Sequence, residues 1–401
     1  MTLERETPVP GPQSATTEPD DVFRARLREF FTANHPGRPP KDPRERLPWT
    51  KAWLAVLFDA GYAGPSWPRE FGGMELTFAR QMIYTEEMAR ARVPGPLGTG
   101  LNIAAPTIIK YGSQEQKQRW LAPMLRGDLV WVQGYSEPEA GSDLPSLRTT
   151  ARREGDEYVV NGQKVWTSHG ADGDIIFALV RTGTRESRQK GITYLIIDAH
   201  APGVQVRPLR DLTGGHLFAE IFFDDVRVPV ANRVGEENDG WRLARTSLGH
   251  ERAAGAMLQA ANYRRVLTEL EELARERGLL TDPLVRDRFV DLEIRVRIIR
   301  FNAERTISGI LTRGDAGAAS SVSRLLITAF EQDIHEFAVD LLGPAGLLGK
   351  SAPQAVQRSR WLTGFLRTRA STIGAGTREI QLNTVAEQVL GLPHDPGMPP
   401  R

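Results

Sequence analysis

The spacing of apolar residues changes twice along this chain of 401 residues and divides it into three parts. From 21 to 127 apolar residues recur mostly at three- and four-residue steps, as on one face of a helix. From 128 to 233 the period is two, which is typical of strands, and from 234 to 393 the helical period returns. The pattern predicts an α+β protein with three domains at these boundaries.

The middle part predicts a small antiparallel β-barrel. Short apolar runs at 175–180, 193–197 and 219–223 are typical of buried strands, and no long helix separates them. An antiparallel barrel therefore fits better than repeated strand–helix–strand units. The Asn161-Gly162 pair suits the positive φ angles of a tight turn, so a hairpin is expected over 157–166.

A leader is expected before the first part, and the first part itself is expected to be helical. Residues 1–20 are rich in Pro, Thr, Glu and Ser and lack the apolar core of a secretory signal, so a disordered leader is expected. Helices are expected to carry Glu86 and Glu87 and to cover 115–125. The two glutamates are interpreted as a solvated helix face.

The last part predicts long helices. Phe330, Ile334, Phe337, Ala338 and Leu341 share one stripe of such a helix. Long helices with few breaks indicate a four-helix bundle, followed by a short tail at 394–401.

Composition excludes several classes of function. With a formal net charge of +1, nothing favours nucleic acid or an anionic membrane as a partner, and no apolar run is long enough to span a bilayer. The chain has no cysteine, which excludes disulfides and thiolate catalysis. Its seven histidines are isolated, so no metal site is predicted. A cytoplasmic location is the default expectation.

Three segments carry residue types suited to a flat polar ligand. Residues 135–143 (YSEPEAGSD) combine hydroxyls with small residues, which allow a ligand to approach the backbone closely. Residues 164–170 (KVWTSHG) place an aromatic plane before two hydroxyls. Residues 373–381 (IGAGTREIQ) lie near the C-terminus.

In this order and spacing the three segments resemble those of the acyl-CoA dehydrogenase family of flavoenzymes. The resemblance covers nearly the whole chain after the leader and implies the same arrangement of helical domain, β-barrel and helical bundle. It implies FAD as the cofactor, an acyl-CoA substrate of fatty acid metabolism, and reoxidation by an electron-transfer flavoprotein. It also implies a homotetramer or homodimer.

The resemblance assigns roles to the first two segments. The Ser136 hydroxyl and the adjoining backbone would hold the flavin ring, and Ser142 would contact flavin phosphate or the acyl thioester arm. Trp166 would cover the flavin, and Ser168 would meet its N5 atom, where a donor stabilises the reduced ring. The positions implied to bind FAD are Gln133, Tyr135, Ser136, Gly141, Ser142, Trp166, Thr167, Ser168, Asp340, Gly343, Thr377 and Glu379.

The implied contacts from the C-terminal part are of two kinds. Thr377 and Glu379 are expected to open a helix that meets the adenine end of FAD. Residues 340–346 resemble a second family signature, whose glycines, including Gly343, let the FAD of a neighbouring subunit approach. Asp340 stands where glutamine is frequent, and Pro344 replaces a small flexible residue.

Dehydrogenation also requires a base. Removing a proton next to a thioester needs a carboxylate in an apolar pocket, where burial raises its pKa. Many relatives place a glutamate directly before the Gly-Thr of the C-terminal motif, but this chain has Ala375 there. A branch resembling isovaleryl-CoA dehydrogenases takes its base from the first helix of the C-terminal bundle, which implies Glu251. Arg252 would order the substrate site; a surface Glu-Arg pair is the alternative interpretation.

Two further functional interpretations stay open. Enzymes of the same fold act on acyl groups bound to carrier proteins, or use reduced flavin and oxygen as monooxygenases. A base at Glu251 favours dehydrogenation over oxygenation, but it does not separate CoA from a carrier protein. A chain of this kind can also be a non-catalytic partner subunit of a heteromeric dehydrogenase.

Overall fold

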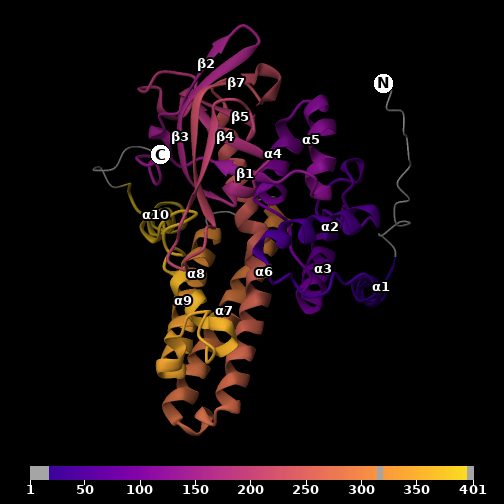
Figure 1. Ribbon diagram of the computed structural model, residues 1–401, viewed down its shortest axis with the longest axis vertical. Helices are drawn as coiled ribbons and strands as arrows, with labels where there is room; N and C mark the ends of the chain where they lie inside the picture. Colours follow the sequence, from indigo (N-terminus) through magenta and orange to yellow (C-terminus); the bar gives the residue numbers. More distant parts are fainter. Residues whose placement is uncertain (1–17, 314–318, 395–401) are drawn as a thin grey trace. The chain divides into compact units, whose positions relative to one another are not determined.

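The computed structural model describes residues 18–313 and 319–394. The chain forms two compact units (Figure 1). One contains the residues up to 209 together with 216–250, and the other contains 210–215 and the residues from 251 onward. Most of the expected leader and nearly all of the expected tail lie outside the described residues.

The first unit begins with helices, as the apolar spacing predicts. The α5 helix shows why they start where they do: Ser113 Oγ accepts from the Gln116 N–H at 3.2 Å, and Gln116 Oε1 accepts from the Ser113 N–H at 3.1 Å. This capping box satisfies two of the donors that a helix start leaves unpaired. The helices are α1 (Asp20–Ala33), α2 (Arg46–Asp59), α3 (Phe78–Ala91), α4 (Ala105–Tyr111) and α5 (Gln114–Arg126).

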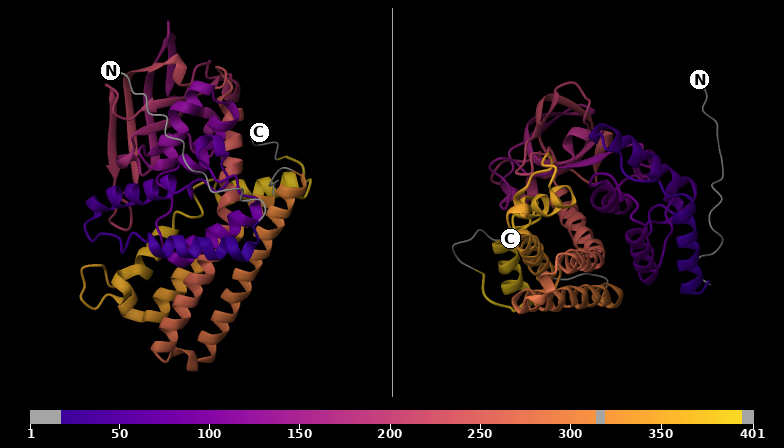
Figure 2. Two further views of the ribbon diagram at one scale, coloured as in Figure 1. Left: turned by 90° about the vertical axis from the view of Figure 1, so that its right-hand side faces the viewer. Right: turned by 60° about the horizontal axis from the view of Figure 1, so that its bottom comes forward.

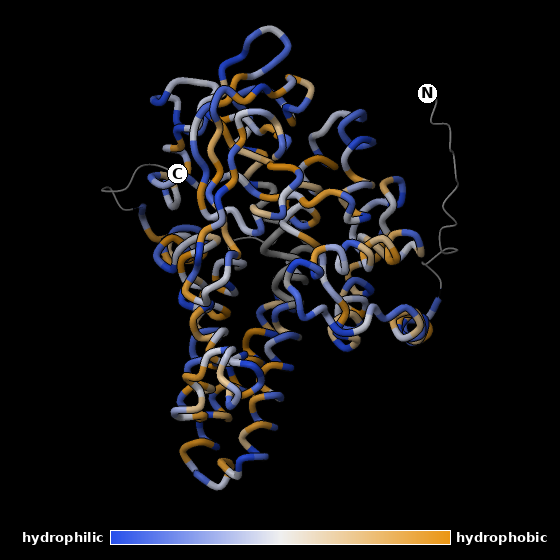
Figure 3. The backbone as a smooth tube through the Cα atoms, viewed as in Figure 1, coloured by the Kyte–Doolittle hydropathy of each residue, from blue (hydrophilic) through white to orange (hydrophobic). Residues whose placement is uncertain are grey.

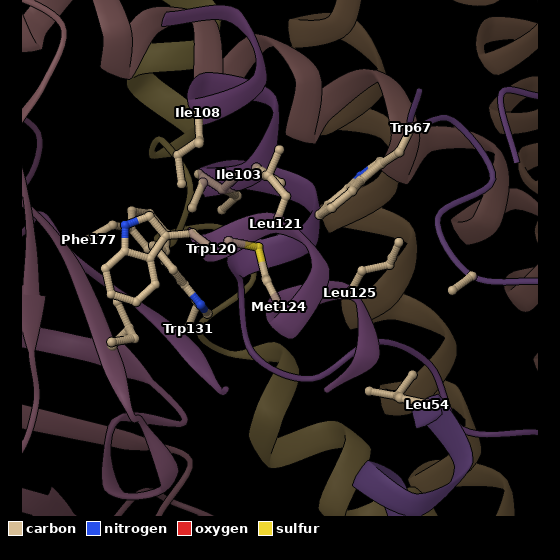
Figure 4. Close-up of a cluster of buried hydrophobic side chains, with 14 of the residues drawn as sticks. Leu54, Trp67, Ile103, Ile108, Trp120, Leu121, Met124, Leu125, Trp131 and Phe177 are labelled. Atoms are coloured by element: carbon tan, nitrogen blue, oxygen red, sulfur yellow. The ribbon is translucent and has the colours of Figure 1, made fainter. Parts of the chain in front are cut away.

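Side chains of α4, α5 and the sheet form one buried cluster (Figure 4). The rings of Trp120 and Trp131 meet edge to face, with their centroids 5.5 Å apart. Trp131 lies on the first strand of the sheet, so this contact fixes the helical layer against the strand that leads into residues 135–143.

The strands form one sheet with the order β6-β7-β3-β2-β4-β5-β8, and β1 pairs with β4. Pairing is antiparallel except that β1 and β2 each run parallel to β4. The three strands expected from apolar runs are β4, β5 and part of β7. The strands are β1 (Trp131–Gly134), β2 (Thr150–Glu154), β3 (Glu157–Ser168), β4 (Ile175–Arg181), β5 (Ile192–Asp198), β6 (Val204–Leu209), β7 (Phe218–Pro229) and β8 (Arg233–Val234).

The hairpin expected at Asn161-Gly162 is wrong. These residues lie inside β3, where the register against β7 shifts by one residue. Asn161 pairs with Asp225 of β7, donating to its carboxylate at 2.8 Å and accepting from its backbone N–H at 2.9 Å. A Cβ at position 162 would lie 2.6 Å from the Thr149 Cα, so the glycine serves a bulge rather than a turn. The true turn is at Gly155, where φ is +62°.

The interpretation of Glu86 and Glu87 as a solvated face is also wrong for Glu87, which is 2% exposed. Its carboxylate accepts hydrogen bonds from Arg24 (2.7 Å), Arg28 (2.9 and 3.0 Å) and Arg90 (3.0 Å). Burial would raise the pKa of Glu87, but these guanidinium groups hold it below its usual value. The helical period alone does not reveal that α1 covers this side of α3.

The second unit is helical. Figures 1 and 2 show α7 and α8 side by side, and Figure 3 shows polar and apolar positions interleaved along the long helices. Phe330, Ile334 and Ala338 are buried, which confirms the expected stripe on α8. The helices are α6 (Gly240–Glu276), which begins in the first unit, α7 (Pro283–Arg313), α8 (Ala319–Leu342), α9 (Arg360–Thr368) and α10 (Arg378–Thr384).

Within 18–313 and 319–394, no helix combines the length and the apolar character needed to cross a membrane.

Candidate functional site

The two flavin-type segments of the first unit lie on β1, the loop that follows it, and β3. β1 supplies Gln133, residues 135–143 lie in the loop that joins β1 to β2 (residues 135–149), and Trp166 to Ser168 close β3. The Val165 N–H donates to the Ser136 carbonyl at 2.9 Å, which joins the start of the loop to β3. The structure thus brings together eight of the positions that the sequence assigned to one ligand.

A buried ion pair fixes the start of the loop. Lys164 is fully buried, and its Nζ donates to Glu137 Oε1 at 2.7 Å and to the Tyr135 carbonyl at 3.1 Å. Glu137 also accepts from the backbone N–H groups of Arg148 (2.6 Å) and Thr149 (2.9 Å). The carboxylate therefore connects both ends of the loop to β3.

The protonation of this pair follows from its surroundings. Burial alone would raise the pKa of Glu137, but the Lys164 ammonium and the donors from Thr149 and Arg148 hold it below its usual value. Burial lowers the pKa of Lys164, and Glu137 opposes that shift. With 2.7 Å between Nζ and Oε1, each group favours the charged form of the other.

Arg181 fixes the far end of the same loop. Its buried guanidinium donates to the carbonyls of Pro145 (2.6 Å) and Leu147 (2.9 Å). It also donates to the carbonyls of Thr184 (3.2 Å) and Arg188 (2.9 Å) in the next loop. Because a guanidinium carries five donors in a rigid plane, one side chain can hold both loops in place.

The sequence did not assign roles to Glu137, Lys164 and Arg181. The available signal was a charged residue in or beside a segment whose alternate positions are buried, since a buried charge needs partners. Lys164 lies on β3 and Arg181 ends a strand that is buried along its length.

Trp166 belongs to the surface rather than to the core. A second shift of register in β3, between Lys164 and Thr167, places Trp166 at φ +62° and leaves it 63% exposed. Its ring meets that of Phe218 edge to face, with the centroids 6.0 Å apart. The bulge therefore presents an aromatic plane at the end of β3.

Gln133 Nε2 on β1 and Thr167 Oγ1 on β3 are buried and lack a hydrogen-bond partner among the described residues. Buried polar groups in native proteins are nearly always paired, so unpaired ones point to a ligand that supplies the partner. At Gly141, an added Cβ would meet nothing within 4 Å, and Gly141 and Ser142 are both exposed. These features fit a polar, flat group such as a flavin at the positions the sequence implied.

The second unit holds the other implied contacts. Thr377 is the N-cap of α10 and accepts from the Ile380 N–H at 3.3 Å, so the expected helix start is confirmed, with Glu379 exposed in its first turn. Asp340 is exposed near the end of α8, and Gly343 follows that helix with φ +55°.

The segment before Thr377 is held to α8. Arg324 donates to the carbonyls of Ser371 (2.8 Å) and Gly374 (2.7 Å). Ala375, which occupies the position of the alternative catalytic glutamate, adopts φ +54°. Glu251 and Arg252 lie in α6, but their side chains fall outside the described part of the structure.

The order of helical domain, sheet domain and helical domain defines the class of protein. Residues 17–128 match the N-terminal domain of acyl-CoA dehydrogenases, 133–226 match the middle domain, and 238–390 match the C-terminal domain. The chain belongs to the acyl-CoA dehydrogenase family and is an enzyme of that family, as the resemblance implied.

Similar proteins and solved structures support the same family. The acyl-CoA dehydrogenase IpdE1 of Mycobacterium tuberculosis is 37% identical over 384 residues, which cover 94% of this chain and 98% of the relative. A solved structure described as the Tcur3481-Tcur3483 steroid ACAD is 31% identical, with a TM-score of 0.83, over 94% of this chain and 99% of that chain. A chain of the ChsE4-ChsE5 complex from Mycobacterium tuberculosis is 32% identical, with a TM-score of 0.81. The match covers 96% of this chain and 100% of that chain.

Proposed function

We propose that the protein is an FAD-dependent dehydrogenase that converts an acyl-CoA thioester to its trans-2-enoyl product. The observation that carries this proposal is a pair of buried atoms without a hydrogen-bond partner, Gln133 Nε2 on β1 and Thr167 Oγ1 on β3. Both lie beside the loop that Glu137, Lys164 and Arg181 hold in place. Bound FAD supplies the acceptor for the hydride that leaves the β-carbon. Residues 135–142 and 166–168 hold the cofactor in this account.

Lys164, Glu137 and Arg181 contribute by fixing the loop before the ligand arrives. Because the loop is fixed at both ends by buried charges, its N–H groups and hydroxyls need little reorganisation on binding. Ser168 is proposed to donate to flavin N5, and Ser142 to contact the flavin phosphate or the thioester arm. Asp340, Gly343, Thr377 and Glu379 are proposed for the adenine end and for the FAD of a neighbouring subunit.

Glu251 is proposed as the general base that takes the α-proton, with Arg252 ordering the site. Ala375 supports this choice, because it removes the carboxylate that many relatives place before Gly376-Thr377. A carboxylate on α6 then remains as the candidate at the other position known from the resemblance.

The substrate is proposed to be the CoA thioester of a bulky, ring-containing acid derived from a steroid. This substrate class is supported by the similar solved structure that is described as a steroid ACAD. Gly249 and Gly255 flank Glu251 in the sequence, and glycines at these positions would permit a wide or deep pocket. Reduced enzyme is proposed to pass its electrons to an electron-transfer flavoprotein.

Turnover with an artificial electron acceptor tests this function. Wild-type protein should reduce the acceptor with steroid-derived acyl-CoA, and Glu251→Gln should abolish turnover while FAD remains bound. Glu272→Gln, an exposed change on the same helix as Glu251, serves as the matched control and should keep full activity. Turnover that survives Glu251→Gln would reject Glu251 as the base.

A second candidate function is a subunit that acts only within a heteromeric dehydrogenase. The ChsE4-ChsE5 relative is described as a complex, and Asp340 and Pro344 depart from the family signature that meets a neighbouring subunit's FAD. If purified protein binds FAD only after a second subunit is added, this candidate replaces the first.

A further inference from the structure

A strained turn precedes α10 in the second unit. Ala375 and Gly376 both adopt left-handed backbone conformations, with φ +54° and +94°. The Arg378 N–H donates to the Thr372 carbonyl at 3.0 Å, which closes the turn onto the first residue of α10. A left-handed conformation is unfavourable for alanine and persists only where surrounding contacts hold it. The contacts that hold residues 371–376 therefore set where α10 begins.

Arg324 supplies the strongest of these contacts from α8, which packs against α10 (Figure 1). Its guanidinium donates to the carbonyls of Ser371 at 2.8 Å and Gly374 at 2.7 Å, on either side of Thr372. Within the described residues the side chain has no other hydrogen bond and no ion pair, and its Nε is buried without a partner. Hydrogen bonds from a charged donor are about twice as strong as neutral ones. The Arg324 side chain therefore holds this turn and no other polar group of the described chain.

Two glutamine side chains add neutral contacts to the same turn. Gln332 of α8 donates to the Thr368 carbonyl at 3.1 Å and to Thr372 Oγ1 at 3.4 Å. Gln381 of α10 donates to the Ala375 carbonyl at 3.4 Å. These hydrogen bonds are longer and come from neutral donors, so each is weaker than those of the guanidinium. Removing the guanidinium should therefore loosen the turn more than removing either amide.

We propose that Arg324 is a positioning residue for FAD: it fixes the turn at 371–376 and so places Thr377 and Glu379 against the adenine end of the cofactor. Arg324 does not itself touch FAD in this proposal, because it acts through the backbone carbonyls that it holds. A segment that is fixed before its ligand arrives loses less conformational freedom on binding. The inference rests on the proposed function, since it needs FAD as the ligand.

Titration with FAD and with FMN tests this role, because FMN carries the same flavin but lacks the adenosine half. Full-length protein freed of bound cofactor is titrated with each, and flavin fluorescence reports binding. Arg324→Met should raise the Kd for FAD about tenfold and leave the Kd for FMN within about twofold of wild type. Arg324→Lys keeps a charged donor and should bind FAD within about threefold of wild type. A general loss of structure, by contrast, would weaken both cofactors.

Arg295→Met is the matched control. Arg295 also contacts α8, but its partner there is Asp333, at 2.5 Å, and not the turn, so this variant should bind both cofactors as wild type does. Circular dichroism checks that all variants are folded. An Arg324→Met protein that binds FAD as tightly as wild type, or that loses FAD and FMN in parallel, would overturn the proposal. A wild-type protein that binds neither cofactor would reject the proposed function, and this inference with it.

Discussion

Two buried carboxylates of the first unit, Glu137 and Glu87, are compensated by different kinds of partner. Glu137 is paired with a fully buried lysine and two backbone N–H groups. Glu87 is surrounded by Arg24, Arg28 and Arg90, whose side chains are between 32% and 60% exposed. The first arrangement fixes a loop that carries ligand-type residues, whereas the second joins helices of one layer.

The difference lies in what each partner loses when the pair is broken. If Glu87 is neutralised, its arginines can turn toward water, because each is already partly solvated. Glu137 and Lys164 cannot turn toward water, because both are buried. If either one is removed, the other becomes an uncompensated buried charge. The Glu137 pair should therefore affect both stability and cofactor binding, and the Glu87 cluster only stability.

Lys164→Met should have the largest effect. It leaves Glu137 buried without its cation, which costs about 3–5 kcal/mol of the free energy of unfolding. The loop at 135–143 loses two contacts, so FAD should dissociate more readily. Chemical denaturation and FAD fluorescence measure the two effects, and Lys164→Arg is the partial rescue. A Lys164→Met protein that binds FAD as tightly as wild type would show that the Lys164–Glu137 pair does not hold the loop for FAD.

Glu87→Gln should have a smaller effect, about 1–3 kcal/mol on the free energy of unfolding, because charge-assisted hydrogen bonds become neutral ones. FAD affinity should not change, since the cluster joins α1 and α3 and contacts none of the flavin-type residues. Denaturation and FAD titration of the same samples make the comparison. If Glu87→Gln lowered FAD affinity as much as Lys164→Met does, the two clusters would not differ in their effect on cofactor binding.

Acid should weaken both clusters, with a smaller effect than either substitution because protonation keeps the hydrogen-bonding atoms in place. The pKa values of Glu137 and Glu87 are both lowered from 4.5 in the folded protein. A lowered folded pKa contributes stability that is complete above 4.5 and is lost as the pH falls through the folded value. The pH profile of unfolding should flatten below 4.5 in Glu87→Gln relative to wild type. Profiles that superimpose would contradict the lowered pKa.

Thr167→Val should have the smallest effect on stability. Its hydroxyl has no partner among the described residues, so an isosteric apolar side chain should change the free energy of unfolding of the FAD-free protein by less than about 1 kcal/mol, or raise it. FAD should bind about tenfold more weakly if that hydroxyl meets the cofactor. Equal FAD affinity in both proteins would show that Thr167 pairs with something else.

The sequence predicted the three-part α+β order, the strands at 175–180 and 193–197 and the start of α10, because apolar period and helix capping are local signals. It assigned eight ligand-type residues to one ligand, and the structure brings them together on β1, the following loop and β3. It failed where the outcome depends on a distant partner. Asn161 pairs with Asp225 of β7, and Glu87 is covered by α1, and neither partner can be inferred from neighbouring residues.

The same limit explains why the sequence does not predict the roles of Glu137, Lys164 and Arg181. The Lys164 side chain is held by Glu137, which lies 27 positions earlier in the chain and which the fold brings within 2.7 Å. Period and motif describe which residues share a face, but not which charges meet across elements.

If the loop between β1 and β2 holds a flavin that accepts electrons from an acyl-CoA, adding the substrate must reduce that flavin. The most direct measurement is the visible absorption spectrum of purified protein, before and after anaerobic addition of steroid-derived and straight-chain acyl-CoAs. We expect flavin bands that bleach with the bulky steroid-derived thioester. A protein that shows no flavin bands after addition of FAD, or a bound flavin that none of these thioesters bleaches, would contradict it.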